Sequence, residues 1–117
     1  MEKADDLSTG ARYDHEMGLV QTTQWVQEMG SERFEHFVLI ALSTETGEVL
    51  DVYKKSMTGQ KTFDREHCLE EMSDVLWSLS LLAQGEGSSM NELMEIGIAK
   101  MHKRHPERYA APLAERS

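Results

Sequence analysis

The sequence predicts an all-α protein, and three features of its patterning and composition support this class. Apolar residues recur at spacings of three and four over long stretches, which is the period of an amphipathic helix. Both prolines, Pro106 and Pro112, lie near the C-terminus, so nothing before them forbids long helices. Leu, Met, Glu, Ala and Lys dominate over β-branched residues, a mixture that favours helix over strand.

Four helical segments are predicted between two polar tails, within one domain that covers residues 1–117. The tails, about 1–12 and 107–117, carry no clear apolar period, so we expect them to be loosely ordered. Ser31 and Ser89 are residue types that cap helix N-termini, as is Asp64. With these caps, the segments are expected at about 14–29, 31–57, 65–84 and 90–105.

The two central segments are joined by a short polar turn at 58–62, so we expect them to pack antiparallel as a helical hairpin. An antiparallel bundle of about four helices follows. Eight methionines in a chain of 117 residues suit either gap-filling in the core or an oligomer surface. We expect oligomerisation to complete the bundle, as a homodimer or a homotetramer.

Charge and cysteine content narrow the class of protein. The net charge of −9 argues against a nucleic-acid partner, because proteins that follow a phosphate backbone are usually basic. The N-terminal stretch has no apolar signal region, and no apolar run is long enough to span a bilayer. A single cysteine, Cys68, excludes an internal disulfide, and we expect it to be buried and inert. We therefore expect a cytoplasmic protein with no membrane partner.

The central helices interrupt their apolar stripes with carboxylates at a spacing of three. Glu45 and Glu48 share one helix face, and Glu71 and Asp74 share another. An antiparallel hairpin would bring all four around one point, and an oxygen-rich set of this kind suits Mg²⁺ or Mn²⁺ rather than zinc. The alternative is a solvated acidic face, since the same spacing recurs elsewhere in the chain, at Glu32/Glu35, Glu48/Asp51 and Glu92/Glu95.

Gly47 lies between the first two carboxylates. A glycine inside a helix costs about 1 kcal/mol relative to alanine, so we expect a compensating benefit. Close approach of another helix, or room for a ligand beside Glu48, would supply one; a tolerated packing glycine is the alternative.

These motifs resemble those of the MazG-like, all-α nucleoside triphosphate pyrophosphohydrolases. Glu45-Thr-Gly-Glu48 is followed, after 22 residues, by Glu71-Met-Ser-Asp74-Val-Leu-Trp, which is similar to the family's E-E-x-x-E and E-x-x-D signature. The basic stretch at 98–106 also resembles the last helix of MazG-like members. The chain departs from the pattern at Thr44, where the family has Glu, and at Gly97, where Asn is common.

The resemblance implies Mg²⁺-dependent hydrolysis of a nucleoside triphosphate, expected to be a dNTP, to the monophosphate and pyrophosphate. Such an activity would clear surplus or non-standard nucleotides. It implies that Glu45, Glu48, Glu71 and Asp74 hold the metal and form the catalytic centre. It leaves open the base and sugar of the substrate and which carboxylate acts as general base.

Five further residues are candidates for substrate binding. Lys55 lies seven residues beyond Glu48, on nearly the same face, and could reach a phosphate; a solvated lysine is the alternative. Lys100 and Arg104, which match the family's basic segment, are candidate phosphate contacts or partners of the helix dipole. The two tryptophans, Trp25 and Trp77, are candidates for stacking on a nucleobase or for the core.

Three other functions are alternatives for this sequence. A phosphoribosyl-ATP pyrophosphohydrolase belongs to the same superfamily but usually has a different basic loop. A ferritin-like di-iron bundle requires Glu-x-x-His motifs, and no histidine here has Glu three residues before it. A non-catalytic helical module whose acidic stripe binds a basic partner predicts no metal dependence.

His67, four residues before Glu71, could add a nitrogen ligand or simply lie exposed in a first helical turn.

Overall fold

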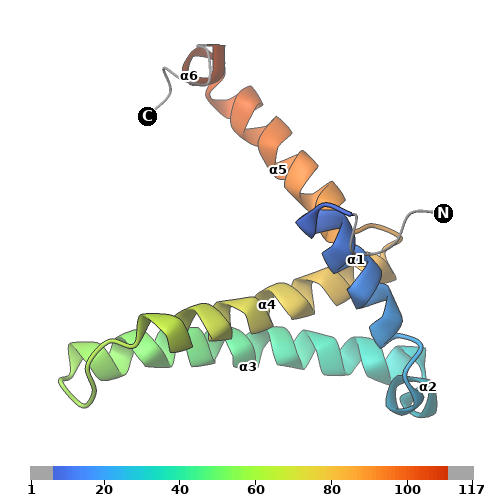
Figure 1. The fold of residues 1–117 in the computed structure, drawn as a ribbon, viewed down its shortest axis with the longest axis horizontal. Helices are drawn as coiled ribbons and strands as arrows, with labels where there is room; N and C mark the ends of the chain where they lie inside the picture. Colours follow the sequence, from blue (N-terminus) through green and yellow to red (C-terminus); the bar gives the residue numbers. More distant parts are fainter. Residues whose placement is uncertain (1–6, 111–117) are drawn as a thin grey trace.

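The computed structural model describes residues 7–110, and this part of the chain is all-α, as predicted, with no strand in it. Figure 1 shows a long helical hairpin from whose one end the remaining helices lead away. In chain order the helices are α1 (Thr9–Val20), α2 (Gln24–Met29), α3 (Ser31–Met57), α4 (Arg65–Gly85), α5 (Met90–Arg104) and α6 (Pro106–Ala110).

Helices α3 and α4 form the predicted antiparallel hairpin and pack together more extensively than any other pair (Figure 1). Gly59 has a φ of 77°, a left-handed conformation that glycine adopts without strain, and it lies in the turn between them. The Asp64 carboxylate then accepts a hydrogen bond of 3.1 Å from the His67 backbone N–H, which confirms the predicted cap of α4.

The single helix predicted over 14–29 is wrong, because the structure has two shorter helices there. Helix α1 begins at Thr9, within the predicted N-terminal tail, and the Ser8 hydroxyl caps it by accepting from the Ala11 N–H. It ends at Val20, after which the hydroxyls of Thr22 and Thr23 donate to the carbonyls of the preceding turn. Such local bonds offer the backbone an alternative to continued helix.

The C-terminal tail is also more ordered than predicted. Helix α5 ends at Arg104, and α6 begins at Pro106, a residue favoured in a first helical turn. Helix α6 continues to Ala110, so the described part of the predicted tail is helical. The predictions for residues 1–6 and 111–117 lie outside the described residues.

The main core cluster is small and lies at one end of the hairpin. Helix α1 and helix α2 pack there against the first half of α3 and the second half of α4. Its buried members are Met17, Val26, Phe34, Val38 and Leu81, with Trp77 among the partly buried residues packed against it. The carboxylate-bearing turns of α3 and α4 lie beyond this cluster, toward the hairpin turn. Cys68 is buried as predicted.

The chain is extended for its length. Its radius of gyration is 17.8 Å, whereas a compact chain of this size has about 13 Å. Its accessible surface is 9013 Å², against about 6,500 Å² for a compact monomer of the same mass. Much of the exposed surface is apolar. No helix among residues 7–110 combines the length and apolar character needed to cross a bilayer.

Helix α5 is held to α1 by a cap that comes from a distant part of the sequence. The Asp14 carboxylate accepts hydrogen bonds from the backbone N–H groups of Met90, at 2.9 Å, and Asn91, at 3.2 Å. The Ser89 hydroxyl accepts from the Glu92 N–H, as the sequence predicted. These bonds satisfy donors that the first turn of any helix leaves unpaired.

We expect Asp14→Ala to lower the free energy of unfolding by about 1 kcal/mol, the usual effect of losing an N-cap side chain. Denaturant unfolding would measure this change. His15→Ala is the matched control, since this neighbouring side chain is exposed on the same helix. Equal stability of the two variants would show that the Asp14 cap contributes nothing.

Candidate active site

Three of the four predicted carboxylates meet between α3 and α4. Glu45 from α3 and Glu71 and Asp74 from α4 each offer an oxygen, and these atoms lie within 4.8 Å of one another. Glu71 and Asp74 share a face of α4 because they are three residues apart, and the antiparallel packing brings Glu45 opposite them. Glu45 and Glu71 are half-buried, whereas Asp74 is exposed. We call these three residues the carboxylate cluster.

The members of the carboxylate cluster repel one another. Partial burial raises the pKa of the Glu45 carboxyl, and the negative charges of Asp74, Glu71 and Glu48 raise it further. A hydrogen bond with Asp74 acts in the same direction. A raised carboxyl pKa means that the folded protein resists the fully ionised state of the cluster. A bound cation would remove this cost.

Glu48 lies beside the carboxylate cluster rather than within it. Its side chain is exposed and lines a neighbouring cavity of about 120 Å³, together with residues from the two ends of the hairpin turn. Its charge still acts on Glu45. The structure therefore brings three of the four predicted ligands together and places the fourth one helical turn along α3.

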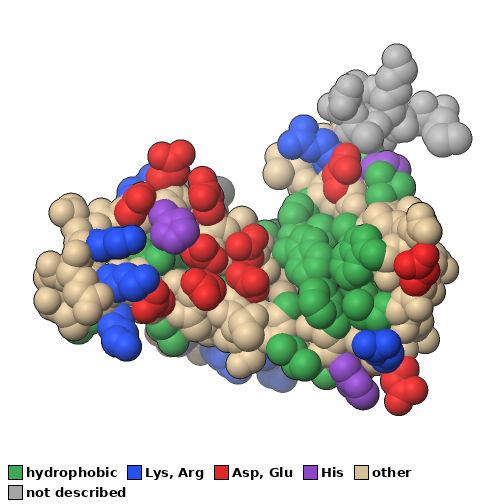
Figure 2. Space-filling model, turned by 90° about the horizontal axis from the view of Figure 1, so that it is seen from below, with side chains coloured by type: hydrophobic (Ala, Val, Ile, Leu, Met, Phe, Trp, Pro, Cys, Tyr) green, Lys and Arg blue, Asp and Glu red, His purple; other side chains and the backbone are tan. Residues whose placement is uncertain are grey.

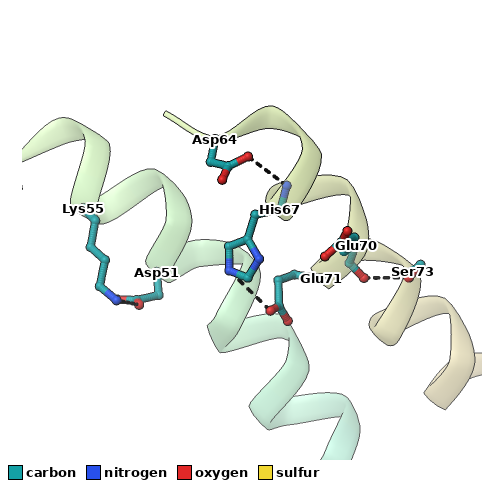
Figure 3. A network of polar contacts seen from close by, with 7 residues as sticks. All are labelled: Asp51, Lys55, Asp64, His67, Glu70, Glu71 and Ser73. Atoms are coloured by element: carbon teal, nitrogen blue, oxygen red, sulfur yellow. Dashed lines mark hydrogen bonds and ion pairs between the residues drawn. The ribbon is translucent and has the colours of Figure 1, made fainter. Parts of the chain in front are cut away.

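Two lysines and a histidine line the same small cavity. Lys55 and Lys61 are among its lining residues, and so is His67. Lys55 is the residue that the sequence suggested as a phosphate contact. In the structure its Nζ lies 2.8 Å from the Asp51 carboxylate, and the two form an ion pair within α3 (Figure 3). This pairing raises the pKa of Lys55 and lowers that of Asp51. Lys61 is not among the binding residues predicted from the sequence. The only feature of the sequence that points to it is its position in the polar turn between the two central helices.

His67 points from α4 toward Glu71, one member of the carboxylate cluster (Figure 3). Its Nε2 lies 3.5 Å from the Glu71 Oε1, and its side chain is 52% exposed. The sequence left two alternatives for His67, a nitrogen ligand or an exposed residue in a first helical turn. The structure places it in an exposed first turn, where it also contacts Glu71. At this distance the imidazole can orient the Glu71 carboxylate.

Aromatic residues gather on the side of the hairpin that carries the acidic residues. Figure 2 shows a broad hydrophobic patch next to the acidic side chains. Trp25 packs edge-on against Phe34 and Phe37, with ring centroids 5.7 and 5.9 Å away, and it is 44% exposed. Trp77 is half-buried and packs against the core. The structure thus gives Trp77 a core contact and leaves part of the Trp25 ring accessible.

Phe37 is an aromatic residue that the sequence argument missed. It precedes Glu48 by eleven residues, about three helical turns, so it lies on nearly the same face of α3 as Glu48, about 16 Å away along the axis. Its ring is 41% exposed. The signal available in the sequence was its spacing of eleven from Glu48.

The two basic residues of the last long helix lie away from the carboxylate cluster of the same chain. Lys100 and Arg104 are exposed on the distal part of α5, which leads away from the hairpin (Figure 1). A single chain therefore does not bring them to the cluster.

The sequence departs from the family signature at Thr44 and Gly97, and the structure shows the surroundings of both residues. The Thr44 hydroxyl donates to the Ala41 carbonyl of its own helix at 3.1 Å, and the residue is exposed. A Cβ at Gly97 or at Gly47 would meet no atom within 4 Å, so neither glycine is required by packing within the described chain.

Fold and site together define an all-α protein with a cluster of three carboxylates on a helical hairpin. The family model for the MazG nucleotide pyrophosphohydrolase domain matches residues 35–109, more than half of the chain. The protein belongs to this family, which confirms the resemblance seen in its sequence. No curated protein and no solved structure matches the chain.

Glu45→Gln removes one of the mutually repelling charges. In metal-free protein at pH 7 we expect it to raise the Tm by about 1–4 °C, because like charges at this spacing cost a few tenths of a kcal/mol. The pKa of Glu45 is raised on folding, so its destabilising effect is present above that pKa and fades as the pH falls through it. The gain should therefore vanish in acid.

Thermal unfolding with EDTA or Mg²⁺ measures this effect. Mg²⁺ should raise the Tm of the wild type and have a much smaller effect on Glu45→Gln. Glu70→Gln, which removes a charge from an exposed position of α4, is the control and should retain the response to Mg²⁺. A lower Tm for Glu45→Gln in EDTA would contradict the repulsion inferred at this cluster.

Proposed function

We propose that the protein hydrolyses nucleoside triphosphates, and dNTPs in particular, to the monophosphate and pyrophosphate in a reaction that requires Mg²⁺. The observation that carries this proposal is the convergence of Glu45, Glu71 and Asp74 between α3 and α4 in a chain of the MazG family. Removal of surplus or non-standard nucleotides is the role that such an activity would serve.

The carboxylate cluster suits a hard divalent cation. It offers oxygen donors only, and the mutual repulsion that raises the pKa of Glu45 would be relieved by positive charge. Glu45, Glu71 and Asp74 would hold Mg²⁺ or Mn²⁺ together with Glu48, which has an exposed carboxylate one turn away. When bound, the cation neutralises phosphate charge and favours attack by water.

The reaction is a displacement at the α-phosphorus. A water oxygen forms the new bond to this phosphorus, and the bond to the oxygen that bridges the α- and β-phosphates breaks. Pyrophosphate leaves with the electron pair of that bond, and the proton from water passes to one of the carboxylates. Two products, a nucleoside monophosphate and pyrophosphate, account for all atoms of the triphosphate and water.

Basic residues from two parts of the fold are proposed to contact the phosphates. Lys55 and Lys61 line the cavity that Glu48 also lines, one helical turn from Glu45, so their ammonium groups would be available to contact phosphates. Lys100 and Arg104 lie far from the cluster of their own chain, so we propose that the α5 of a second copy brings them to it. This role requires a homodimer or a homotetramer.

The nucleobase is proposed to bind on the aromatic side of the carboxylate cluster. Exposed ring surface on Trp25 and Phe37 lies on the side of the hairpin that bears Glu45, and a base stacks on such surfaces. Trp77, three residues after Asp74, would line this region from α4.

Asp74→Asn tests the proposed activity directly. Pyrophosphate release from a panel of dNTPs and NTPs, with Mg²⁺ or Mn²⁺, should fall by at least about 100-fold, since loss of a metal ligand removes several kcal/mol of transition-state stabilisation. Glu70→Gln is the matched control and should retain wild-type rates. Equal rates for Asp74→Asn and wild type would disprove the proposed role of Asp74.

Absence of turnover on every nucleotide, with a Tm that Mg²⁺ does not change, would favour the non-catalytic acidic module. A preference for phosphoribosyl-ATP over all dNTPs would favour the other enzyme of the superfamily. Pyrophosphate release with any of the dNTPs separates the proposed function from both.

Phe37→Ala tests the proposed base site. Because the ring would bind the substrate equally well before and during the reaction, its loss should raise KM by about 10-fold and leave kcat within about 2-fold. Steady-state kinetics with the best dNTP measure both constants. Leu39→Ala, a truncation of an exposed apolar residue on another face of α3, is the control. A fall in kcat alone would contradict a base-binding role.

A further inference from the structure

The junction between α1, α4 and α5 is a polar network that lies outside the carboxylate cluster. The Gln84 side chain joins α4 to α1: its Nε2 donates to the Asp14 backbone carbonyl at 3.3 Å, and its Oε1 accepts from Gln21 at 3.0 Å. The Asp14 carboxylate then joins α1 to α5 by accepting from the N–H groups of Met90 and Asn91. Helix α5 is therefore tied to the hairpin through α1 as an intermediate.

The direct connection from α4 to α5 does not by itself set the direction of α5. The C-terminal end of α4 is closed by the Ser88 N–H, which donates to the Ala83 carbonyl at 2.8 Å. Ser89 follows in an extended conformation, with φ −151° and ψ 166°, and α5 begins at the next residue. Because each residue has two soft backbone dihedrals, rotation at this one residue swings the whole of α5. The hydrogen bonds from Asp14 select one direction.

Close packing at the start of α5 supports the position that Asp14 selects. A Cβ at Gly10 of α1 would collide with the Asn91 side chain, and it would also lie 3.4 Å from the Met94 Cε. The first turns of α1 and α5 approach this closely because Gly10 has no side chain. Asp14 follows Gly10 by four residues, so the two share a face of α1. Helix α1 therefore holds the first turn of α5 by hydrogen bonds and by packing.

The far end of α5, which leads away from the hairpin, carries Lys100 and Arg104 (Figure 1). These residues lie about 15 and 21 Å along the axis from Met90, where the helix begins. A tilt of about 20° at the start of the helix would therefore move them by about 5 and 7 Å. Charge-assisted hydrogen bonds to a phosphate form at about 2.7–2.9 Å, so a displacement of this size breaks them.

We propose that Asp14 is a positioning residue for substrate binding and acts through the direction that it gives to α5. Its carboxylate holds the start of the helix whose far end presents Lys100 and Arg104 to the phosphates. The inference rests on the proposed function, in which these two basic residues contact the triphosphate. A carboxylate suits this position because its two oxygens accept from two adjacent N–H groups, and because the helix dipole favours negative charge there.

Double-mutant kinetics test this role. Asp14→Ala should lower kcat/KM for the best dNTP by about 10-fold, because binding groups that are misplaced lose much of their contribution. In protein that already carries Lys100→Ala and Arg104→Ala, the same change should alter kcat/KM by less than about 2-fold, because the residues through which Asp14 acts are gone. A general loss of stability would lower activity equally in both backgrounds, so equal losses would overturn the inference.

Two further variants separate the positioning role from effects of charge. Glu16→Gln removes an exposed carboxylate from the same helix and should retain wild-type kinetics. Asp14→Asn keeps one acceptor oxygen, and asparagine is itself a favoured N-cap residue, so it should recover part of the activity that Asp14→Ala loses. Wild-type kcat/KM for Asp14→Ala, in a protein that hydrolyses dNTPs, would overturn the inference while leaving the proposed function intact.

A distance measurement tests the structural step without any turnover. Nitroxide labels at Lys103→Cys on α5 and Glu70→Cys on α4, both exposed positions, can be read by pulsed electron paramagnetic resonance; the native Cys68 is buried. Dilution with unlabelled protein restricts the signal to distances within one chain. The distribution should be narrow in otherwise wild-type protein and broader with Asp14→Ala.

The two failures can be told apart. An unchanged distance distribution with Asp14→Ala would overturn the inference, whatever the turnover. Absence of turnover by the wild type, together with the expected broadening, would disprove the proposed function, and the substrate role of Asp14 would fall with it.

Discussion

The antiparallel packing of α3 against α4 is the constraint on which the rest of the structure depends. Val38, Cys68 and Ser78 are almost completely buried on these two helices. Their packing fixes the register that brings Glu45 opposite Glu71 and Asp74. Partial burial, and then the negative charges of its neighbours, raise the pKa of Glu45, so the ionised cluster does not contribute to holding the hairpin together. Apolar burial stabilises the hairpin. The packing of the two helices then determines where their acidic residues lie.

The core cluster and the carboxylate cluster lie at different positions along the hairpin. The core cluster joins α1 and α2 to the end of the hairpin where α3 begins and α4 ends. The carboxylate cluster lies nearer the turn, where α3 and α4 pack against each other and the other described helices lie away from them (Figure 1). Such a separation allows exposed charge to accumulate near the turn without disturbing the core, and it leaves the site accessible.

The sequence predicted those parts of the fold that follow from local patterns. The long central helices, their turn and the caps Asp64 and Ser89 were found because each depends on residues a few positions apart. The break after Val20 was missed because it depends on two threonine hydroxyls competing with the helix backbone. The direction of α5 was beyond prediction, since it depends on Asp14, a residue 76 positions away from the amide that it caps.

For the site, spacing identified the carboxylates but not their exact grouping. Residues three apart share a face only approximately, and the packing angle between α3 and α4 decides which oxygens meet; here it leaves Glu48 one turn outside the cluster. The same geometry decides where apolar residues stay exposed. When acidic residues occupy one side of a two-helix layer, the apolar residues that do not face the partner helix are left on the other side. A hairpin that collects a carboxylate cluster in this way therefore has exposed apolar side chains, such as Leu50 and Leu76, on its other side.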